Sequence, residues 1–356
     1  MHFVDVERSC KVSGGTTYLL LLAQGLAERG HQFTLAAREG ALSSSFAEAG
    51  ARYLRTWCWP FSIPQISSYL RDRPADVFLC SGRGRARLAA LSLAERFRRP
   101  CICSLHDPLW PGQTLPDMLR PTALVALEEP IYEGLLALGV PAERVHLWPR
   151  PVRCRELSTP PAEGFQVLHL GRLSESKWHS AAALIEAIPG LLEAVPDLRV
   201  TIVGGGGKLA TVRQLAAAAN ARCSREVIAA VGEMLDPLSW IERANLVVAG
   251  GYACLEALYN GRPALGSGFG WFGPVTRGRM AEAVAQHFGD RSPEEGSASR
   301  MRQAILELRE ALRDPQSAGP YLPRPDWFSE DHSPAGTALL METLAAELVA
   351  QPSRPR

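Results

Sequence analysis

Two basic residues, Arg172 and Lys177, lie between a short apolar run, 167–170, and a long Ala- and Leu-rich stretch, 178–195. The apolar run has the length of a buried strand, and the longer stretch predicts a helix. A helix begins with free N–H groups and about half a positive charge, so this turn is suited to an anion. Arg can hold two phosphate oxygens at once, and Lys adds a mobile charge. The pair predicts a phosphate site, although two basic residues in a turn are more commonly a solvated loop.

The turn belongs to a strand–helix–strand unit. The second strand, Leu198–Val203, is followed by four glycines, Gly204–Gly207. Strand, helix and strand in succession imply a parallel sheet, in which ligands bind outside the carboxyl ends of the strands. We therefore expect Arg172 and Lys177 at the ligand-binding edge of a parallel sheet.

Two stretches near the N-terminus place chemically useful groups at strand ends as well. Gly14 and Gly15 lie between the first predicted strand and the first predicted helix, where glycine lets backbone N–H groups approach a ligand. His106 comes directly after an apolar run, Pro100–Leu105. A lone His in such a place can be structural, and a glycine pair can be only a tight turn.

A third candidate site lies on a predicted helix in the second half of the chain. Asn245–Ala249 predicts a strand, and a helix follows from about Ala253 to Asn260. Glu256 is on this helix, and a carboxylate can accept hydrogen bonds from two vicinal hydroxyls. The alternative is an exposed helix residue without a ligand. Beyond it, the Gly- and aromatic-rich stretch Gly268–Gly273 follows another strand and is expected near the ligand.

The composition excludes several classes of protein. The 356 residues suit two domains of about 150–180 residues, and 38 basic against 37 acidic residues give no reason to expect nucleic acid as a partner. The eight cysteines are scattered without a CxxC pair, and no apolar run approaches the roughly eighteen residues of a membrane span. Reduced thiols and no signal peptide before the first strand predict a cytoplasmic protein. We expect at most peripheral contact with a membrane.

An Arg-rich segment, Arg83–Arg99, is interleaved with leucines. Its pattern predicts a helix with a solvated basic face. The alternative is a surface for an anionic acceptor or for lipid headgroups.

The order of these motifs resembles glycosyltransferase family 4, whose members have the GT-B fold. The resemblance is carried by LGRLSESK with DLRVTIVGGGG, by NLVVAGGYACLEALYNGRPAL, and by SGGTTYLLLLAQGLAERGHQFTLAA at the N-terminus. It covers most of the chain outside Arg38–Arg73 and Phe288–Pro334.

The resemblance implies an α/β fold of two Rossmann-like, parallel-sheet domains that face a cleft. Residues 1–150 would form the N-terminal domain on the acceptor side, and residues 164–330 the C-terminal domain that holds the nucleotide-sugar donor. A proline-rich linker would run from Pro149 to Glu163. Residues 331–356 would form a C-terminal helix that crosses back to the N-terminal domain, with a short tail.

The resemblance also implies a role for each candidate residue. Arg172 and Lys177 would bind the donor diphosphate, and Glu256 would accept hydrogen bonds from the ribose hydroxyls. The family's motifs would also place Gly14 and Gly15 at the donor phosphates and His106 beside the donor sugar.

One position departs from the family pattern. Many members carry a Glu eight residues before the one that corresponds to Glu256, in a loop that reaches the sugar. Here that position is Val248, within a predicted strand, so sugar recognition cannot use this carboxylate. The backbone N–H groups of Gly251 and Tyr252 are candidates to contact the sugar or a phosphate instead.

The implied reaction is the transfer of a sugar from a nucleotide diphosphate sugar to an unknown acceptor, with retention at the anomeric carbon. His106, Arg172 and Lys177 would be the catalytic set, without a metal ion or another cofactor. The alternatives are a nucleotide-sugar epimerase on the same fold and a non-catalytic module that binds a nucleotide sugar.

Overall fold

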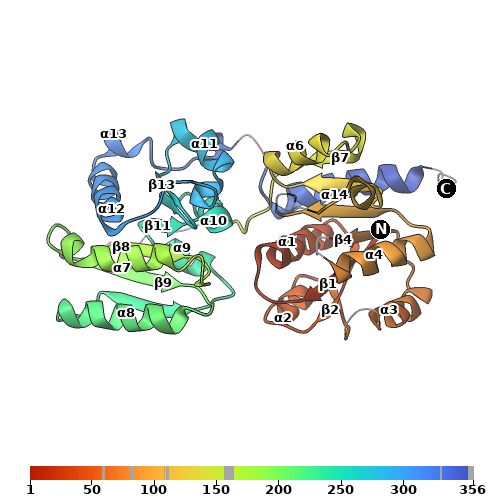
Figure 1. Cartoon of the computed structure of the whole chain (residues 1–356), viewed down its shortest axis with the longest axis horizontal. Helices are drawn as coiled ribbons and strands as arrows, with labels where there is room; N and C mark the ends of the chain where they lie inside the picture. The colour runs from red at the N-terminus through yellow and green to blue at the C-terminus, as the bar shows by residue number, and fades with distance from the viewer. Residues whose placement is uncertain are drawn as a thin grey trace. The chain divides into compact units, whose positions relative to one another are not determined.

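The computed structural model describes residues 1–57, 61–80, 84–107, 109, 112–155, 164–328 and 331–351. The chain forms two compact units (Figure 1). Unit 1 consists of Met1–Val152 together with Glu330–Arg356, and unit 2 consists of Arg153–Ser329. The chain thus passes from one unit to the other at the start of the segment that the sequence marks as a linker, and it returns to unit 1 before its last helix.

Unit 1 is built on a seven-stranded sheet with the order β3-β2-β1-β4-β5-β6-β7, in which all neighbouring strands are parallel. Its central strands are short and mostly apolar, because helices cover both faces of the sheet. The strands are β1 (His2–Ser9), β2 (Gln32–Arg38), β3 (Arg52–Arg55), β4 (Val77–Cys80), β5 (Cys101–Leu105), β6 (Ala123–Ala126) and β7 (Val145–Leu147).

The helices of unit 1 pack into one core on each face of the sheet. One face is covered by α1 (Gly14–Glu28), α2 (Ser43–Glu48) and α14 (Pro334–Ala350). The other face is covered by α3 (Ser62–Arg71), α4 (Arg85–Phe97), α5 (Leu115–Leu119) and α6 (Glu129–Ala137). The order of the strands reverses between β1 and β4, which is the switch point where doubly wound sheets bind ligands at their carboxyl edge.

The last helix, α14, packs along α1 of unit 1 (Figure 1). A Cβ at Gly25 would lie 2.3 Å from the carbonyl oxygen of Pro334, so only glycine allows this close approach. The side chains of Arg29 and Glu342 form an ion pair across the two helices. This packing confirms the helix that crosses back to the N-terminal domain.

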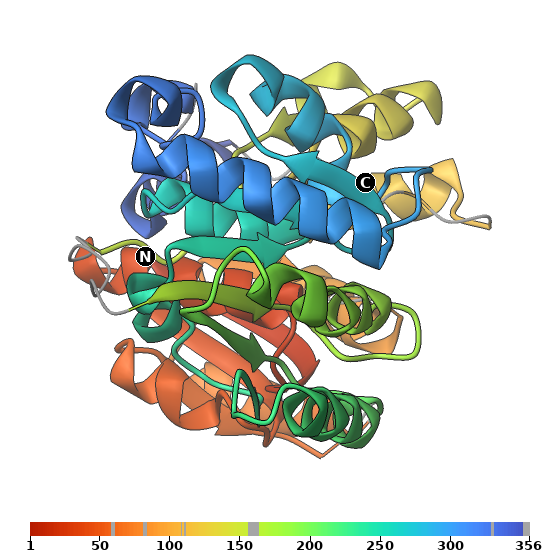
Figure 2. The same cartoon turned by 90° about the vertical axis from the view of Figure 1, so that its left-hand side faces the viewer.

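Unit 2 has a six-stranded sheet with the order β10-β9-β8-β11-β12-β13, in which only β13 is antiparallel to its neighbour. Its strands are β8 (Phe165–Leu170), β9 (Leu198–Val203), β10 (Ile228–Gly232), β11 (Leu246–Ala249), β12 (Ala264–Ser267) and β13 (Trp271–Pro274). Its helices are α7 (His179–Leu192), α8 (Leu209–Arg222), α9 (Leu238–Arg243), α10 (Gly251–Tyr259), α11 (Met280–Ala285), α12 (Ala298–Arg313) and α13 (Pro315–Ala318). Figure 2 shows α12 in blue across the front of this unit, where it packs on α7.

The two parallel-sheet units confirm the predicted α/β fold of two Rossmann-like domains. Three details differ from the expectations. α1 begins at Gly14, so Gly14 and Gly15 form its first turn and are not in a loop. Part of the Gly- and aromatic-rich stretch is a strand, β13. In the Arg-rich segment the helix begins at Arg85, and Arg83 lies outside the described residues.

Among the described residues, no helix is both long enough and apolar enough to cross a membrane.

Candidate functional site

The loop after β8 carries Arg172 and is held in place by the glycine run that follows β9. The Leu173 N–H donates to the carbonyl of Gly205 at 2.8 Å. A Cβ at Gly204 would lie 1.8 Å from the carbonyl oxygen of Gly171, so a side chain there would push the loop away. The glycines therefore let two backbone segments meet at the carboxyl edge of the sheet. They leave the side chain of Arg172 exposed at this edge.

Lys177, on the same loop, forms an ion pair with Asp290. Its Nζ atom lies 2.5 Å from the Asp290 Oδ2 atom, and the two side chains are only 15% and 9% exposed. The Phe269 N–H also donates to this carboxylate at 3.2 Å, and the Lys177 ammonium lies 4.3 Å from the centre of the Phe269 ring. The Lys177 ammonium is thus fixed in position by a buried carboxylate and an aromatic face.

The Asp290 carboxylate is ionised and lies at the start of α10. Burial alone raises its pKa, but the hydrogen bond from His287 and the charge of Lys177 together lower this pKa to about 2. A Cβ at Gly250 or at Gly251 would lie 2.8 Å from one of its oxygens. The glycines therefore make room for a carboxylate at the helix start, where the sequence predicts that backbone N–H groups contact a sugar or a phosphate.

His287 completes this cluster. Its Nδ1 atom lies 3.5 Å from Asp290 Oδ2, and its ring meets the ring of Tyr252 edge-on with 5.9 Å between the centres. His287 and Phe288 have φ angles of 48° and 51°, in the left-handed region that bulky residues rarely adopt. Backbone of this kind costs of order 1–3 kcal/mol per residue and concentrates at functional sites. The structure thus brings His287 and Tyr252 to the ion pair of Lys177.

Sequence reasoning missed Asp290 and His287, both of which come from a segment more than a hundred residues after Lys177. The paired glycines Gly250 and Gly251 were a signal that a group approaches the backbone there. They could not show which group it is.

Glu256 lies one and a half turns into α10 and is 7% exposed, so the alternative of an exposed helix residue is wrong. Its Oε1 atom accepts hydrogen bonds from the backbone N–H and from the Nη1 atom of Arg153, both at 3.2 Å. Burial raises the pKa of Glu256, and the nearby Arg153 opposes this rise. The predicted role of Glu256 at a ribose stays a prediction, and Arg153 is a partner that the sequence did not indicate.

Val248 is fully buried in β11, where it pairs with His169 of β8. This position is therefore part of the sheet core.

In unit 1, the structure brings Gly15 and His106 together at the carboxyl edge of the sheet. A Cβ at Gly15 would lie 4.0 Å from the His106 Cδ2 atom. Gly14 precedes Gly15 in the same turn, whose N-cap Ser13 accepts a hydrogen bond from the Thr16 N–H. These three candidates of unit 1 are thus neighbours, although they are about ninety positions apart in the sequence.

The position of His106 is fixed from two sides. Its ring packs edge-on against the ring of Tyr18 with 4.8 Å between centres, and its carbonyl oxygen accepts a hydrogen bond from Arg150 at 2.5 Å. Arg150 is 6% exposed and lies 3.6 Å from a carboxylate oxygen of Glu128. Arg150 is a buried Arg that the sequence did not indicate.

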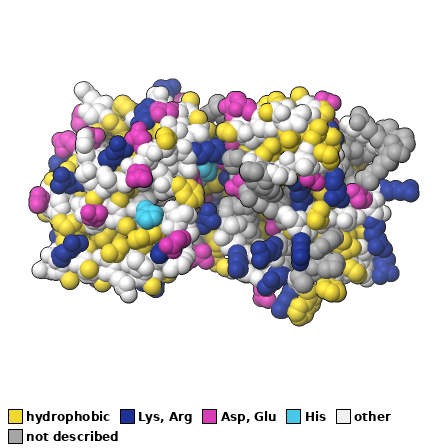
Figure 3. Space-filling view, in the orientation of Figure 1, with side chains coloured by type: hydrophobic (Ala, Val, Ile, Leu, Met, Phe, Trp, Pro, Cys, Tyr) yellow, Lys and Arg dark blue, Asp and Glu magenta, His cyan; other side chains and the backbone are white. Residues whose placement is uncertain are grey.

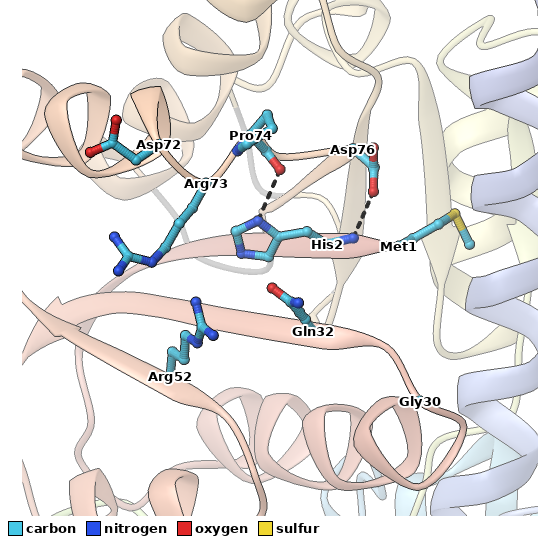
Figure 4. Close-up of a pocket in the computed structure, with 9 residues that line it drawn as sticks. All are labelled: Met1, His2, Gly30, Gln32, Arg52, Asp72, Arg73, Pro74 and Asp76. Carbon is cyan, nitrogen blue, oxygen red and sulfur yellow. Dashed lines mark hydrogen bonds between the residues drawn. The ribbon is translucent and has the colours of Figure 1, made fainter.

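A pocket of about 570 Å³ lies at the other edge of this sheet, at the amino ends of β1, β2 and β3 (Figure 4). Both ring nitrogens of His2 have partners there, the carbonyl of Pro74 at 3.1 Å and the hydroxyl of Thr34 at 2.8 Å. The side chains of Arg52 and Arg73 face the same space. None of the candidate residues lines this pocket.

Comparison with known proteins agrees with this fold. Residues 12–156, nearly all of the first stretch of unit 1, match Glycosyltransferase Family 4. A glycosyltransferase from Rickettsia africae ESF-5 is 14% identical, covers 99% of this chain and 99% of its own, and superimposes with a TM-score of 0.71. The chain has the GT-B fold. The resemblance to family 4 glycosyltransferases is thereby confirmed.

Other solved structures with this fold bind nucleotide sugars. The Anabaena protein HepE in complex with UDP-glucose is 16% identical over 98% of each chain, with a TM-score of 0.65. A UDP-GlcNAc 2-epimerase from Neisseria meningitidis, bound to UDP-GlcNAc, is 12% identical over 97% of this chain and 100% of its own, with a TM-score of 0.60. At these identities the likeness establishes the fold. Among curated proteins, none matches this sequence.

Proposed function

We propose that this GT-B protein is a retaining glycosyltransferase that moves a sugar from a nucleotide diphosphate sugar to an acceptor. The observation that carries the proposal is the fixed Lys177 ammonium, held 2.5 Å from Asp290 at the start of α10. Arg172 is exposed on the same loop, so two cations of unit 2 lie at one sheet edge, one exposed and one in an ion pair. This is the arrangement that a diphosphate requires.

In the proposed reaction, the bond between the anomeric carbon and the diphosphate oxygen breaks while the acceptor oxygen forms a bond to the same face of that carbon. The departing diphosphate takes the proton of the acceptor hydroxyl. Negative charge that develops on the diphosphate is stabilised by Arg172, by Lys177 and by the N–H groups at the start of α10, without a metal ion. The roles of Gly14, Gly15 and His106 at the donor stay as the resemblance implies them.

Glu256 is proposed to accept hydrogen bonds from the ribose hydroxyls. Its support is that a carboxylate on α10 is buried against Arg153 and kept in one orientation, one and a half turns from the start of the helix. Two adjacent hydroxyls are neutral donors, and a carboxylate accepts from both.

The test of the proposal is a thermal-shift series with nucleosides, nucleoside diphosphates and nucleotide sugars. A ligand at a hundredfold excess over its dissociation constant stabilises the protein by about 2.7 kcal/mol. We expect nucleoside diphosphates and one nucleotide sugar to raise the melting temperature, and nucleosides to do so much less. A series in which no nucleotide shifts the melting temperature would overturn the proposal.

A second function, epimerisation of the nucleotide sugar, is favoured by one observation: His287 and Asp290 lie beside the proposed diphosphate site, where an acid–base pair could act on the sugar. Product analysis separates the two activities. An epimerase changes its nucleotide sugar without an acceptor, whereas a transferase releases nucleoside diphosphate when an acceptor is added. Tight binding of the donor with neither outcome would indicate a non-catalytic binding module.

The location proposed for the protein is the cytoplasm. Its support is that the seven cysteines within the described part of the chain are all unpaired, as expected in a reducing compartment.

A further inference from the structure

The pocket at the amino ends of β1, β2 and β3 has no part in the function proposed above (Figure 4). Its volume of about 570 Å³ is within the range of about 300–1,000 Å³ that small-molecule sites have. We propose that this pocket binds a small phosphate ester that carries hydroxyl groups, with the phosphate held between Arg52 and Arg73. The proposal goes beyond the proposed function and does not depend on it, since no residue assigned to the nucleotide sugar lines the pocket.

The register of the sheet places Arg52 in this pocket. Leu54 of β3 packs against the core on the α3 side of the sheet, and side chains two positions apart on a strand share a face, so Arg52 is on that side as well. Its partner on β2 is Thr34. Arg73 follows the end of α3 on the same side. One strand and one helix end thus bring two guanidinium groups to one pocket.

A chain of hydrogen bonds fixes the floor of the pocket beside the two guanidinium groups. Burial lowers the pKa of His2, so its ring is neutral and carries one proton. This proton is on Nδ1, which donates to the Pro74 carbonyl at 3.1 Å, and Nε2 accepts from the Thr34 hydroxyl at 2.8 Å. The Tyr69 hydroxyl lies 3.5 Å from that of Thr34, and the Arg73 guanidinium lies 5.1 Å from the centre of the Tyr69 ring. The floor therefore has a defined shape before a ligand binds.

The charge of the pocket favours an anion. Neither Arg52 nor Arg73 forms an ion pair with any other residue in the described part of the chain. Asp76 already accepts a hydrogen bond from the N–H at the start of β1 at 2.8 Å, and Figure 4 shows it at the far end of the pocket from the Arg pair. The side chain of Asp72 points away from the pocket floor in the same view. The carbonyl end of α3 adds about half a negative charge, which is less than the two positive charges.

Further exposed cations lie near the pocket without lining it. Arg71 is the last residue of α3, and Arg98 and Arg99 follow α4 before β5 begins, so all three lie at the amino edge of the sheet. In Figure 3, dark-blue side chains gather at the right-hand end of unit 1, where Figure 1 shows α4 and the N-terminus. A positive field of this kind raises the local concentration of anions. The pocket then selects among them by its shape and its hydrogen-bonding groups.

The size of the pocket and its other polar groups indicate which anion fits. A guanidinium group holds a phosphate through two parallel hydrogen bonds, and two such groups suit its several oxygens. Inorganic phosphate alone would leave most of the volume of about 570 Å³ empty. In Figure 4 the side chain of Gln32 lies between the Arg pair and Asp76, and amide and carboxylate groups both bind hydroxyls. A sugar or polyol phosphate satisfies these groups, whereas a second anionic group would be repelled by Asp76.

The experiment is calorimetric titration of the full chain with glycerol 3-phosphate, glucose 6-phosphate, inorganic phosphate and glucose. We expect at least one ester to bind, inorganic phosphate to bind at least about tenfold more weakly, and glucose not to bind. Arg52→Gln and Arg73→Gln should each raise the dissociation constant of the ester about tenfold or more, because charge-assisted hydrogen bonds are lost. Arg73→Lys keeps the charge but not the paired hydrogen bonds, so its loss should be smaller.

A matched double variant separates the pocket from the charge around it. Arg71→Gln with Arg99→Gln removes two positive charges from the same end of unit 1 but none from the pocket, so the affinity should stay within about twofold. Arg52→Gln with Arg73→Gln removes the same net charge and should abolish binding. All four Arg are exposed, so both double variants should keep the melting temperature of wild type. A second readout is the NMR signal of the His2 ring, which should move when the ester binds wild type and stay in place with the pocket variant.

The proposal is overturned if neither ester binds, if inorganic phosphate binds as tightly as the esters, or if the control double variant loses as much affinity as the pocket variant. It is also overturned if ester binding is lost in Arg172→Ala and Lys177→Ala instead, since the ester would then occupy the proposed diphosphate site of unit 2. Ester binding that those two variants retain supports the proposal. A wild type that binds an ester in the pocket but binds no nucleotide overturns only the proposed function.

Discussion

The Nζ atom of Lys177 and the Oδ2 atom of Asp290 lie 2.5 Å apart, which joins the loop after β8 to the segment after α11. Asp290 is buried but ionised, because Lys177 and His287 both favour its charged form. A buried carboxylate that has lost one of its partners keeps its desolvation cost. The stability of unit 2 and the position of the Lys177 charge therefore depend on the same pair.

The first prediction is that Asp290 makes unit 2 sensitive to acid. The pKa of Asp290 is about 2 in the folded protein, below the ordinary value of 3.8. The carboxylate therefore contributes stability that is fully present above about pH 4 and is lost as the pH falls towards 2, on the order of 2 kcal/mol. Asp290→Asn should lack this component. Urea denaturation of wild type and variant across this pH range measures it, and parallel pH profiles would contradict the prediction.

The second prediction concerns the two basic residues. Arg172→Ala and Lys177→Ala should each weaken nucleoside diphosphate binding by about 1.5–3 kcal/mol and leave nucleoside binding nearly unchanged, because a charge-assisted hydrogen bond to phosphate is lost. Calorimetric titration with both ligands measures the difference. Lys208→Ala is the matched control, since Lys208 is a half-buried Lys nearby that is paired with the exposed Glu175 at 2.9 Å. An equal loss for both ligands would mean that neither residue touches phosphate.

The two variants should differ in their free energy of unfolding. Arg172 is exposed, so its removal should change the free energy of unfolding by less than about 0.5 kcal/mol. Lys177→Ala leaves Asp290 buried without its cation, so this variant should be clearly less stable.

Elements that are buried on both faces could be predicted almost to the residue. The strand Leu198–Val203 has the bounds that its pattern predicts. Its apolar residues have a single way to be buried, so the local pattern carries the information. The strand Trp271–Pro274 was not predicted, because its antiparallel pairing with β12 depends on a neighbouring strand and its glycines suggest a loop.

The candidate site could be predicted only where a motif is local. Arg172 and Lys177 are five positions apart on one loop, so residues that are close in the sequence are also close in the fold. Asp290 and Arg153 are each more than a hundred positions from the residue they bind. A single Asp or Arg in a polar segment gives no sign of such a partner, since its contact is made by the tertiary fold alone.

The third prediction is that sugar transfer proceeds in the presence of a chelator. In the proposed site, Arg172, Lys177 and the N–H groups at the start of α10 balance the negative charge of the diphosphate. In addition, no Asp-x-Asp sequence occurs in the chain to hold a diphosphate-bound metal ion. The release of nucleoside diphosphate is measured with and without EDTA. Activity that disappears with EDTA and returns with Mn²⁺ would show that the proposal of metal independence is wrong.

The fourth prediction separates a ribose-binding Glu256 from one that only holds Arg153. If Glu256 binds the ribose, Glu256→Ala should weaken ribonucleoside diphosphate binding by about 1.5–3 kcal/mol, with a smaller loss for Glu256→Gln, which keeps the shape. A deoxyribonucleoside diphosphate lacks one of the two hydroxyls, so its affinity should change much less.

Stability has to be controlled in this experiment, because Glu256→Ala also leaves Arg153 without its carboxylate. Asn260, one turn further along α10, supplies the control. Its side chain binds the carbonyl of Arg153 at 2.8 Å and accepts from the Arg155 N–H at 3.1 Å, so Asn260→Ala loosens the same segment and removes no carboxylate. We expect both variants to be less stable, but only the Glu256 variants to lose ribonucleotide affinity. If Glu256→Ala and Asn260→Ala bind the ribonucleotide equally well, Glu256 supports Arg153 alone and the ribose lies elsewhere.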